Sequence, residues 1–289
     1  MKISGKTRVC GLIGDPVEHS LSPSIQNAAF DHLGLDYVYA VFPVTRNNLK
    51  RAIAGMRSLG LHGLNVTMPH KTEVARYLDE LDETAKNVGS VNTILNSNGS
   101  LIGYTTDGIG ALRALRHGGS DPSGKKIVLL GAGGASRSLS FTLVRAAKEF
   151  VILNRTSGKA ERLARDITTL LGDSAKVAAG RLTDENLEKE LTDADILVNA
   201  TSVGMHPNEQ KTPVDRKLLR LGLVVFDLVY EPLETRLLRE AAEIGAKTVN
   251  GLSMLVHQGA ASFEIWTGVK APIEVMMKAA TRELAETKQ

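Results

Sequence analysis

The chain has 289 residues, of which 43% are apolar and 23% charged, a composition typical of globular proteins rather than disordered or fibrous ones. The formal net charge is only +3, no block of five lysines or arginines occurs and aromatic residues make up 4%, so nucleic-acid binding is not expected. The N-terminal residues lack the apolar core of a secretory signal and no run of 18 apolar residues occurs, so we expect a cytoplasmic protein that does not bind membranes.

The first part of the chain alternates short runs rich in β-branched residues with helix-compatible stretches, which is typical of an α/β sandwich. The lone Cys10 lies in the first apolar run and can form no internal disulfide, which suits a reducing compartment. Ser97-Asn98-Gly99 is a hairpin signal between two runs. The expected strands are residues 9–13, 37–44, 63–67, 91–95 and 101–104, and the expected helices are 24–34, 47–59 and 71–88.

A second series of strands and helices predicts a doubly wound Rossmann sheet. Its expected strands are residues 127–130, 150–153, 196–199, 224–229 and 248–249, and its expected helices are 135–147, 158–171, 186–191 and 235–244. Residues 252–286 have helical periodicity and no strand. The residues alone leave open whether this tail completes the second domain or covers the first. No low-complexity linker marks the boundary, which we place within residues 107–124.

Gly131-Ala132-Gly133-Gly134-Ala135 directly follows the apolar run 126–130 and directly precedes a helix-compatible stretch. Backbone N–H groups at such a helix start can receive the pyrophosphate of a dinucleotide. Ser136 stands where the fingerprint has its third glycine, so a plain strand-to-helix turn is the alternative. Since 130 residues precede this turn, we expect them to hold a substrate against the cofactor.

The next expected strand ends in Asn154-Arg155-Thr156, where a site that prefers NAD would carry an acidic residue for the ribose 2′-hydroxyl. The fork of donors of Arg155 can pair with a 2′-phosphate, and Lys159 adds positive charge one turn later. The sequence therefore predicts NADP in preference to NAD. The alternative for Arg155 is a solvated charge at a strand end.

Lys71 follows Asn65-Val66-Thr67-Met68-Pro69-His70 and stands at the start of an expected helix. A cation there meets the positive end of the helix dipole, which is unfavourable for a purely structural residue. Hydride transfer at a hydroxyl carbon also needs a group that exchanges the hydroxyl proton, and a lysine can be that group. A solvated lysine is the alternative. For Asp107 the alternative is an N-cap of a helix at 109–115, and both roles can coexist.

Other polar residues are ambiguous singly. Ser20 and Ser22 lie beside Pro23, so they are either helix caps or donors to a ligand. Asn92 interrupts an apolar strand, and a buried amide there needs a partner or a ligand. The seven histidines show no zinc-ligand spacing, so no metal is expected.

Taken together, these motifs resemble the shikimate/quinate dehydrogenase family over nearly the whole length. The resemblance rests on nine ordered segments, whereas a chance Rossmann match would supply only the middle two. They are residues 18–23 (EHSLSP), 65–71 (NVTMPHK), 89–93 (GSVNT), 103–108 (GYTTDG), 131–137 (GAGGASR), 154–156 (NRT), 199–205 (NATSVGM), 227–232 (DLVYEP) and 250–255 (NGLSML).

The resemblance implies reversible NADP-linked reduction of 3-dehydroshikimate to shikimate, in chorismate and aromatic amino acid biosynthesis, by a monomer or homodimer. It implies a substrate domain at 1–107, completed by C-terminal helices at 252–289, and an NADP-binding Rossmann domain at 108–251. Lys71 would transfer the proton, or mainly orient and polarise the carbonyl, with Asp107 as its partner. The implied substrate contacts also include Ser20, Ser22, Thr67, Asn92, Tyr230 and Gln258. The implied cofactor contacts are Gly131, Ala132, Gly133, Gly134, Ala135, Asn154, Arg155, Thr156, Lys159, Thr201, Leu228 and Gly251.

Two residues depart from the family pattern, and we expect them to affect substrate affinity more than the type of reaction. Thr105 stands where the family usually has Asn, and Ser90 where it commonly has Ala. Three alternatives remain: a quinate-using or aminoshikimate-using relative, a non-catalytic NADP-binding regulator, and a thioester-reducing Rossmann enzyme such as a glutamyl-tRNA reductase. The last needs a nucleophilic cysteine, and Cys10 lies in a strand that looks buried.

Overall fold

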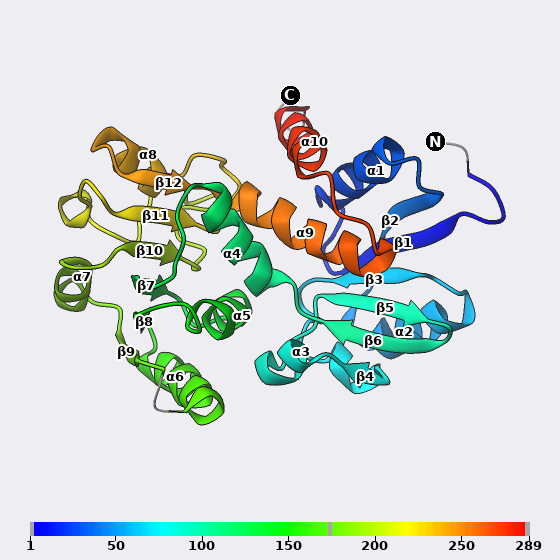
Figure 1. Ribbon diagram of the computed structural model, residues 1–289, viewed down its shortest axis with the longest axis horizontal. Coiled ribbons are helices and arrows are strands. Elements are labelled where there is room, and N and C mark those ends of the chain that lie inside the picture. The colour runs from blue at the N-terminus through cyan, green and yellow to red at the C-terminus, as the bar shows by residue number, and fades with distance from the viewer. Residues whose placement is uncertain (1–2, 173–174, 287–289) are drawn as a thin grey trace. The chain divides into compact units, whose positions relative to one another are not determined.

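The computed structural model describes residues 3–172 and 175–286 and divides into two compact units. Unit 1 comprises residues 1–110 and 256–289, and unit 2 comprises residues 111–255. Each unit carries one six-stranded sheet with helices (Figure 1). The fold is α/β, as predicted. No helix in the described part of the chain is long and apolar enough to cross a membrane.

The sheet of unit 1 is mixed, with strand order β2-β1-β3-β5-β6-β4. Strands β1, β2 and β3 are parallel, whereas β5 runs antiparallel to both β3 and β6. Asn98 and Gly99 both have positive φ and form the two-residue turn between β5 and β6, which confirms the predicted hairpin. The strands are β1 Arg8–Gly14, β2 Tyr37–Pro43, β3 Gly63–Val66, β4 Glu80–Leu81, β5 Thr93–Ser97 and β6 Ser100–Tyr104.

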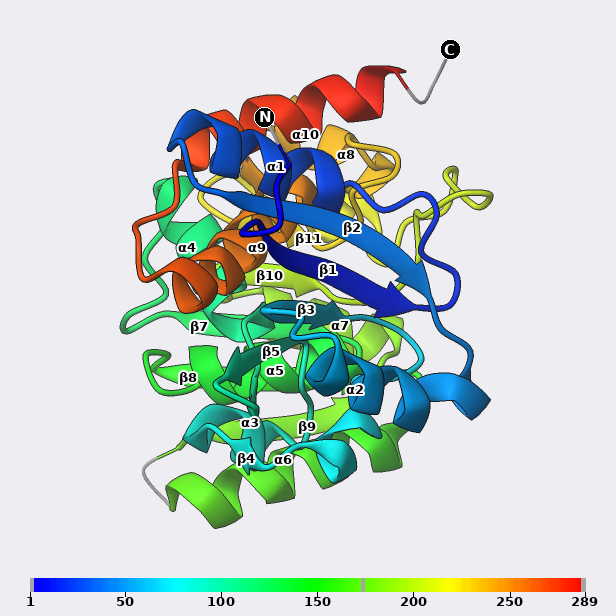
Figure 2. The same cartoon turned by 90° about the vertical axis from the view of Figure 1, so that its right-hand side faces the viewer.

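Helices from both ends of the chain belong to unit 1. The Ser24 hydroxyl donates to Glu283 at 2.7 Å and links the first helix to the last, which lie side by side (Figure 2). The tail therefore packs on the N-terminal unit. The helices are α1 Ser22–His32, α2 Leu49–Ser58, α3 Glu83–Val88, the start of α4 Asp107–His117, most of α9 Gly251–Thr267, and α10 Ile273–Glu286, with 3-10 turns η1 Arg46–Asn48 and η2 Val74–Tyr77.

The predicted helix at 71–88 is wrong. The chain instead makes turns, the 3-10 helix η2, the short strand β4 and the helix α3. Asp79 accepts the Leu101 N–H at 2.6 Å, and β4 then pairs with β6. Asp82 caps α3 by accepting N–H groups from Thr84 and Ala85. Pairing with β6 and the new cap therefore override the local helical pattern.

The sheet of unit 2 is wholly parallel, with strand order β12-β11-β10-β7-β8-β9, so it is doubly wound as predicted. The strand order reverses between β7 and β10, which is where such sheets bind ligands. The strands are β7 Lys126–Leu130, β8 Glu149–Asn154, β9 Val177–Arg181, β10 Ile196–Asn199, β11 Val224–Asp227 and β12 Lys247–Val249. The helices are α5 Gly134–Leu143, α6 Ser157–Leu171, α7 Asp184–Leu191 and α8 Arg236–Glu243, with a 3-10 turn η3 Arg216–Leu218. The edge strand β9 is not among the strands expected from the sequence.

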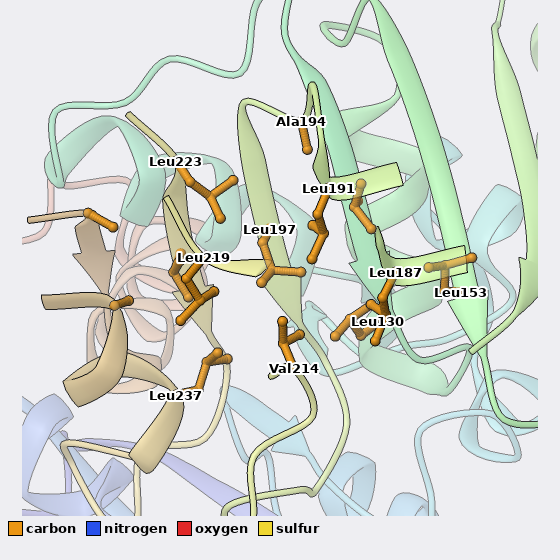
Figure 3. Packing of buried hydrophobic residues seen from close by; sticks show 14 of the residues in the cluster. Leu130, Leu153, Leu187, Leu191, Ala194, Leu197, Val214, Leu219, Leu223 and Leu237 are labelled. Carbon is orange, nitrogen blue, oxygen red and sulfur yellow. The ribbon is translucent and has the colours of Figure 1, made fainter. Parts of the chain in front are cut away.

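A leucine-rich core joins this sheet to its helices. Leu130, Leu153 and Leu197 from the strands meet Leu187 and Leu191 of α7 and Leu237 of α8 (Figure 3). All are almost fully buried. Because interiors pack as densely as organic crystals, this core fixes the carboxyl ends of the strands, where the candidate nucleotide residues lie.

Candidate active site

Lys71 and Asp107 form an ion pair in unit 1. Lys71 Nζ lies 2.7 Å from Asp107 Oδ2, and the side chains are 26% and 7% exposed. Lys71 lies in a turn before η2, so the argument from a helix dipole was wrong although the residue it selected does have a charged partner. Asp107 is the first residue of α4 rather than a residue preceding the helix. An accessible ammonium group held against a nearly buried carboxylate can exchange a proton with a bound hydroxyl or ketone.

Asn92 is the centre of the polar cluster around this pair. Its Nδ2 donates to Asp107 Oδ1 at 2.8 Å and to the Thr106 hydroxyl at 2.9 Å, and lies 3.3 Å from Gln258 Oε1. Its Oδ1 accepts the Thr106 N–H at 2.8 Å. Asn92 is 2% exposed. The amide therefore has partners on both atoms, as a buried amide requires, and orients the carboxylate that faces Lys71.

A second amide, Asn65 on β3, extends the cluster and was missed by the sequence analysis. Its Nδ2 donates to the Asn92 carbonyl oxygen at 3.1 Å and to the Ser262 hydroxyl at 3.0 Å. Its Oδ1 accepts from the Tyr39 hydroxyl at 2.8 Å. Burial raises the pKa of Tyr39 well above its ordinary value, and a hydrogen bond with Ser22 opposes that rise. An amide within an apolar strand is the sequence signal that selected Asn92, and the same signal was available for Asn65.

The remaining predicted substrate residues of unit 1 lie on or beside α1, β3 and α9. Ser20 Oγ accepts the Ser22 N–H at 3.2 Å, immediately before Pro23 in α1. Thr67 follows β3. Its methyl group lies so close to Gly14 that a Cβ on Gly14 would clash with it. Gln258 lies on α9, and Gly110 of α4 is so close to it that a Cβ there would lie 2.6 Å from Gln258 Cβ. Tyr230 lies instead in unit 2, directly after β11 and its neighbours Leu228 and Val229.

The glycine turn of unit 2 lies at the reversal of strand order. Gly131 has φ +109°, and a Cβ there would lie 2.9 Å from the Ala200 carbonyl oxygen, so only glycine fits. Ala132 follows, and the exposed Gly133 and Gly134 have nothing within 4 Å of their would-be Cβ positions. Helix α5 begins at Gly134 and continues through Ala135. This is an open cradle at a helix N-terminus, which fits a pyrophosphate.

The end of β8 presents exposed cations. Asn154 Nδ2 donates to the Thr156 carbonyl oxygen at 2.9 Å and shapes the turn into α6. Arg155 and Lys159 are exposed, and within residues 3–172 and 175–286 neither forms an ion pair. Free guanidinium and ammonium groups at this strand end fit the 2′-phosphate of NADP, because no carboxylate neutralises them.

The other three predicted cofactor residues lie on the β10–β11 side of the sheet. The Thr201 hydroxyl donates to Asn199 Oδ1 at 2.7 Å, and the Leu228 N–H donates to the Asn199 carbonyl oxygen at 2.9 Å. A Cβ at Gly251 would lie 2.6 Å from the Val229 carbonyl oxygen, so the start of α9 passes close to the segment after β11. Asn199 thus links Thr201 to Leu228, and Gly251 packs against the backbone of Leu228 and Val229.

The potential metal ligands and the lone cysteine are the remaining residues of chemical interest. Within the described residues no group of three His, Cys, Asp or Glu side chains could hold a metal ion. Cys10 is fully buried in β1, and burial raises the pKa of its thiol. A thioester-reducing enzyme needs an accessible thiolate, which Cys10 does not offer.

Comparison with known proteins identifies the family. The shikimate dehydrogenase substrate binding domain model matches residues 12–94, the shikimate/quinate 5-dehydrogenase model matches residues 114–228, and the shikimate 5′-dehydrogenase C-terminal domain model matches residues 251–281. The chain belongs to the shikimate dehydrogenase family.

The similarity to these relatives covers nearly the whole chain. Shikimate dehydrogenase (NADP+) of Methanopyrus kandleri is 50% identical over 287 residues, 98% of each chain. A crystal structure of a shikimate dehydrogenase in complex with NADP+ is 48% identical, with a TM-score of 0.91 over 98% of this chain and 97% of that one. Shikimate 5-dehydrogenase from Listeria monocytogenes, in complex with shikimate and NAD, is 41% identical, with a TM-score of 0.91 over 96% and 98%.

Proposed function

We propose that this chain catalyses the reversible, NADP-dependent reduction of 3-dehydroshikimate to shikimate, a step of chorismate and aromatic amino acid biosynthesis. The observation that carries the proposal is the Lys71–Asp107 pair held by Asn92 in a member of the shikimate dehydrogenase family. We expect the protein to act in the cytoplasm as a monomer or homodimer.

Substrate binding is assigned to the polar cluster of unit 1. Ser20 and Ser22 hold the substrate carboxylate by donating their hydroxyl protons, which complements its charge. Within unit 1, Thr67, Asn92 and Gln258 contact the ring hydroxyls or the carboxylate; Tyr230 of unit 2 stays a contact expected from the family resemblance alone. The buried network behind Asn92 limits its rotation, and a rigid side chain loses little entropy when the substrate binds.

Proton transfer is assigned to Lys71 and Asp107. NADPH, when bound, supplies the hydride that adds to the carbonyl carbon. Lys71 Nζ donates a proton to the carbonyl oxygen in reduction and takes it back in oxidation, so ketone, hydride and proton balance to the alcohol. Asp107 orients Nζ through the 2.7 Å contact, and the exposed part of Lys71 lets the proton be replaced from water.

Cofactor binding is assigned to unit 2. The 131–135 turn would hold the pyrophosphate, and Arg155 and Lys159 the 2′-phosphate, with Asn154 and Thr156 shaping their turn. Thr201, Leu228 and Gly251 would line the other half of the cofactor. Support comes from the open cradle at Gly133 and Gly134 and from the exposed cations at the end of β8.

The first test is the initial rate of absorbance change at a wavelength specific for reduced cofactor, with shikimate or quinate and with NADP or NAD. A fast rate with shikimate and NADP alone supports the proposal. Comparable quinate or NAD rates would indicate a dual-specificity enzyme. Binding of NADP without turnover of any of these acids would indicate a non-catalytic regulator.

The second test replaces the proposed pair. We expect Lys71→Ala and Asp107→Asn to lower kcat by about 10²–10⁴-fold, the usual contribution of a positioned proton-transfer group. Lys71→Arg keeps the charge and separates electrostatic orientation from proton transfer. Lys86→Ala, an exposed lysine on α3, is the matched control. Near-full turnover in all three variants of the pair would refute the assignment.

A further inference from the structure

Asp227, the last residue of β11, is a buried carboxyl group that the proposed mechanism does not use. It is 0% exposed. Its Oδ1 accepts from Asn199 Nδ2 at 2.9 Å and from the Val229 N–H at 3.1 Å, and its Oδ2 accepts from the Thr235 hydroxyl at 2.7 Å. One carboxyl group therefore joins β10, the segment after β11 and the start of α8.

Asn199 passes this connection on to a second segment. Its Oδ1 accepts from the Thr201 N–H and hydroxyl, and its Nδ2 also lies 3.3 Å from the Val203 carbonyl oxygen. The Thr201 hydroxyl in turn accepts the Val203 N–H at 3.2 Å. Segment 201–203 is thus tied to the Asn199 side chain, and segment 228–230 is tied to the Asp227 carboxyl group through the N–H of its central residue, Val229.

Burying the Asp227 carboxyl group costs free energy. Burial raises the pKa of Asp227 to about 6, and the hydrogen bonds from Thr235, Val229 and Asn199 oppose the rise. Among the described residues no lysine or arginine pairs with it. A buried carboxylate that has only neutral donors costs free energy compared with an apolar side chain, so packing alone does not account for it.

The strand order places Asp227 on one particular side of the dinucleotide site. A dinucleotide crosses a doubly wound sheet at the reversal, with one nucleotide half over each set of strands. Arg155 marks the β8 side as the side of the 2′-phosphate, and hence of the adenosine half. The segments tied to Asp227 follow β10 and β11, on the opposite side of the reversal, which is the side of the nicotinamide half.

We propose that Asp227 is a positioning residue that fixes segments 201–203 and 228–230 against the nicotinamide half of NADP, without itself touching the cofactor. This inference rests on the proposed function. It predicts that loss of the Asp227 carboxylate weakens the hold on the nicotinamide half and leaves the adenosine half, bound at the other end of the sheet, unaffected.

The test compares the full cofactor with its adenosine half. Isothermal titration of NADP and of 2′,5′-ADP is carried out with the wild-type protein, Asp227→Asn and the control Asp215→Asn, an exposed aspartate of the same unit. Asp227→Asn keeps the shape of the side chain. It replaces one carboxylate oxygen by an NH₂ group, which cannot accept the proton of the Thr235 hydroxyl. We expect the Kd of NADP to rise about tenfold or more, as for loss of one buried hydrogen-bond partner, and the Kd of 2′,5′-ADP to stay within about twofold.

Variants of Thr235 provide a milder test of the same proposal in case Asp227→Asn does not fold. Thr235→Val removes the donor to Oδ2, and we expect the Kd of NADP alone to rise about threefold or more. Thr235→Ser keeps the hydroxyl and should bind NADP as the wild-type protein does.

Equal weakening of NADP and 2′,5′-ADP binding would show general damage to unit 2 and overturn the inference. Unchanged NADP binding in both Asp227→Asn and Thr235→Val would also overturn it. Failure of the wild-type protein to bind either ligand would overturn the proposed function itself.

Discussion

Arg155 is the residue on which we expect the choice of cofactor to depend. It is exposed at the end of β8 and, within the described residues, forms no ion pair. A 2′-phosphate therefore needs to displace only water to reach the guanidinium group, whereas the 2′-hydroxyl of NAD gains little from a cation. Lys159, one turn into α6, contributes a more distant charge.

We expect Arg155→Ala to reduce the preference for NADP over NAD by about 10–100-fold, since a charge-assisted pair contributes roughly 1.5–3 kcal/mol. The preference is the ratio of kcat/KM with NADP to that with NAD, measured with shikimate. Arg162→Ala, a nearby exposed arginine of α6, is the control. If the ratio for Arg155→Ala equals that of the control, Arg155 is only a solvated charge.

Residue-level inference from the sequence worked where the physical requirement was local. A buried amide must find partners, and Asn92 has partners on both atoms. The reason given for Lys71 failed because it depended on a helix that does not form. Asp227 stands within the motif at residues 227–232, but a single acidic residue at the end of a strand gives no sign that it is buried.

At the scale of elements, α9 presents three hydrogen-bonding side chains at a spacing of four residues. Gln258 lies 3.3 Å from Asn92 Nδ2, the Ser262 hydroxyl accepts from Asn65, and Trp266 Nε1 donates to the Ile94 carbonyl oxygen at 3.0 Å. Residues four apart lie on one face of a helix. The face is therefore held against the sheet by Trp266 at one end and reaches the candidate site with Gln258 at the other.

The packing of Trp266 against β3 can be tested by substituting Gly63. A Cβ at Gly63 would lie 2.5 Å from Trp266 Cδ1, so Gly63→Ala forces the indole ring or the strand to move. We expect the free energy of unfolding to fall by about 1–3 kcal/mol, the usual cost of overpacking, in urea denaturation. Gly55→Ala, in α2 with nothing within 4 Å, should instead raise it by about 0.5–1 kcal/mol. Equal effects of the two changes would contradict the packing argument.

For the whole molecule, the chain order separates the two kinds of candidate site. Unit 1 is built from both ends of the chain and holds the Lys71–Asp107 cluster, and unit 2 is built from the middle and holds the glycine turn. Each unit has its own sheet and its own buried core. A ligand that binds one unit should therefore stabilise that unit first, because ligand binding favours only the state that carries the site.

Hydrogen exchange followed by mass spectrometry measures this directly. We expect 2′,5′-ADP to slow exchange in residues 131–137 and 154–159, and to leave residues 90–107 of unit 1 unchanged. Shikimate should do the opposite. Protection of the glycine turn by shikimate, with none in residues 90–107, would place the substrate on the wrong unit and contradict the assignment.

The sequence by itself determined the elements whose signals are local: the period of the strands, the turn Asn98-Gly99, the glycine turn after β7 and the cation after β8. It also determined the family, because nine motifs in order are far more specific than any one of them. Only the tertiary structure decided what residues 71–88 form, because β4 exists through its pairing with β6. The partnership of Lys71 and Asp107 was expected from the family resemblance, but only the tertiary structure brought Asn65 to Ser262 and Asp227 to Thr235. A hydrogen bond between distant residues depends on how strands and helices pack, and the residue types alone do not encode that geometry.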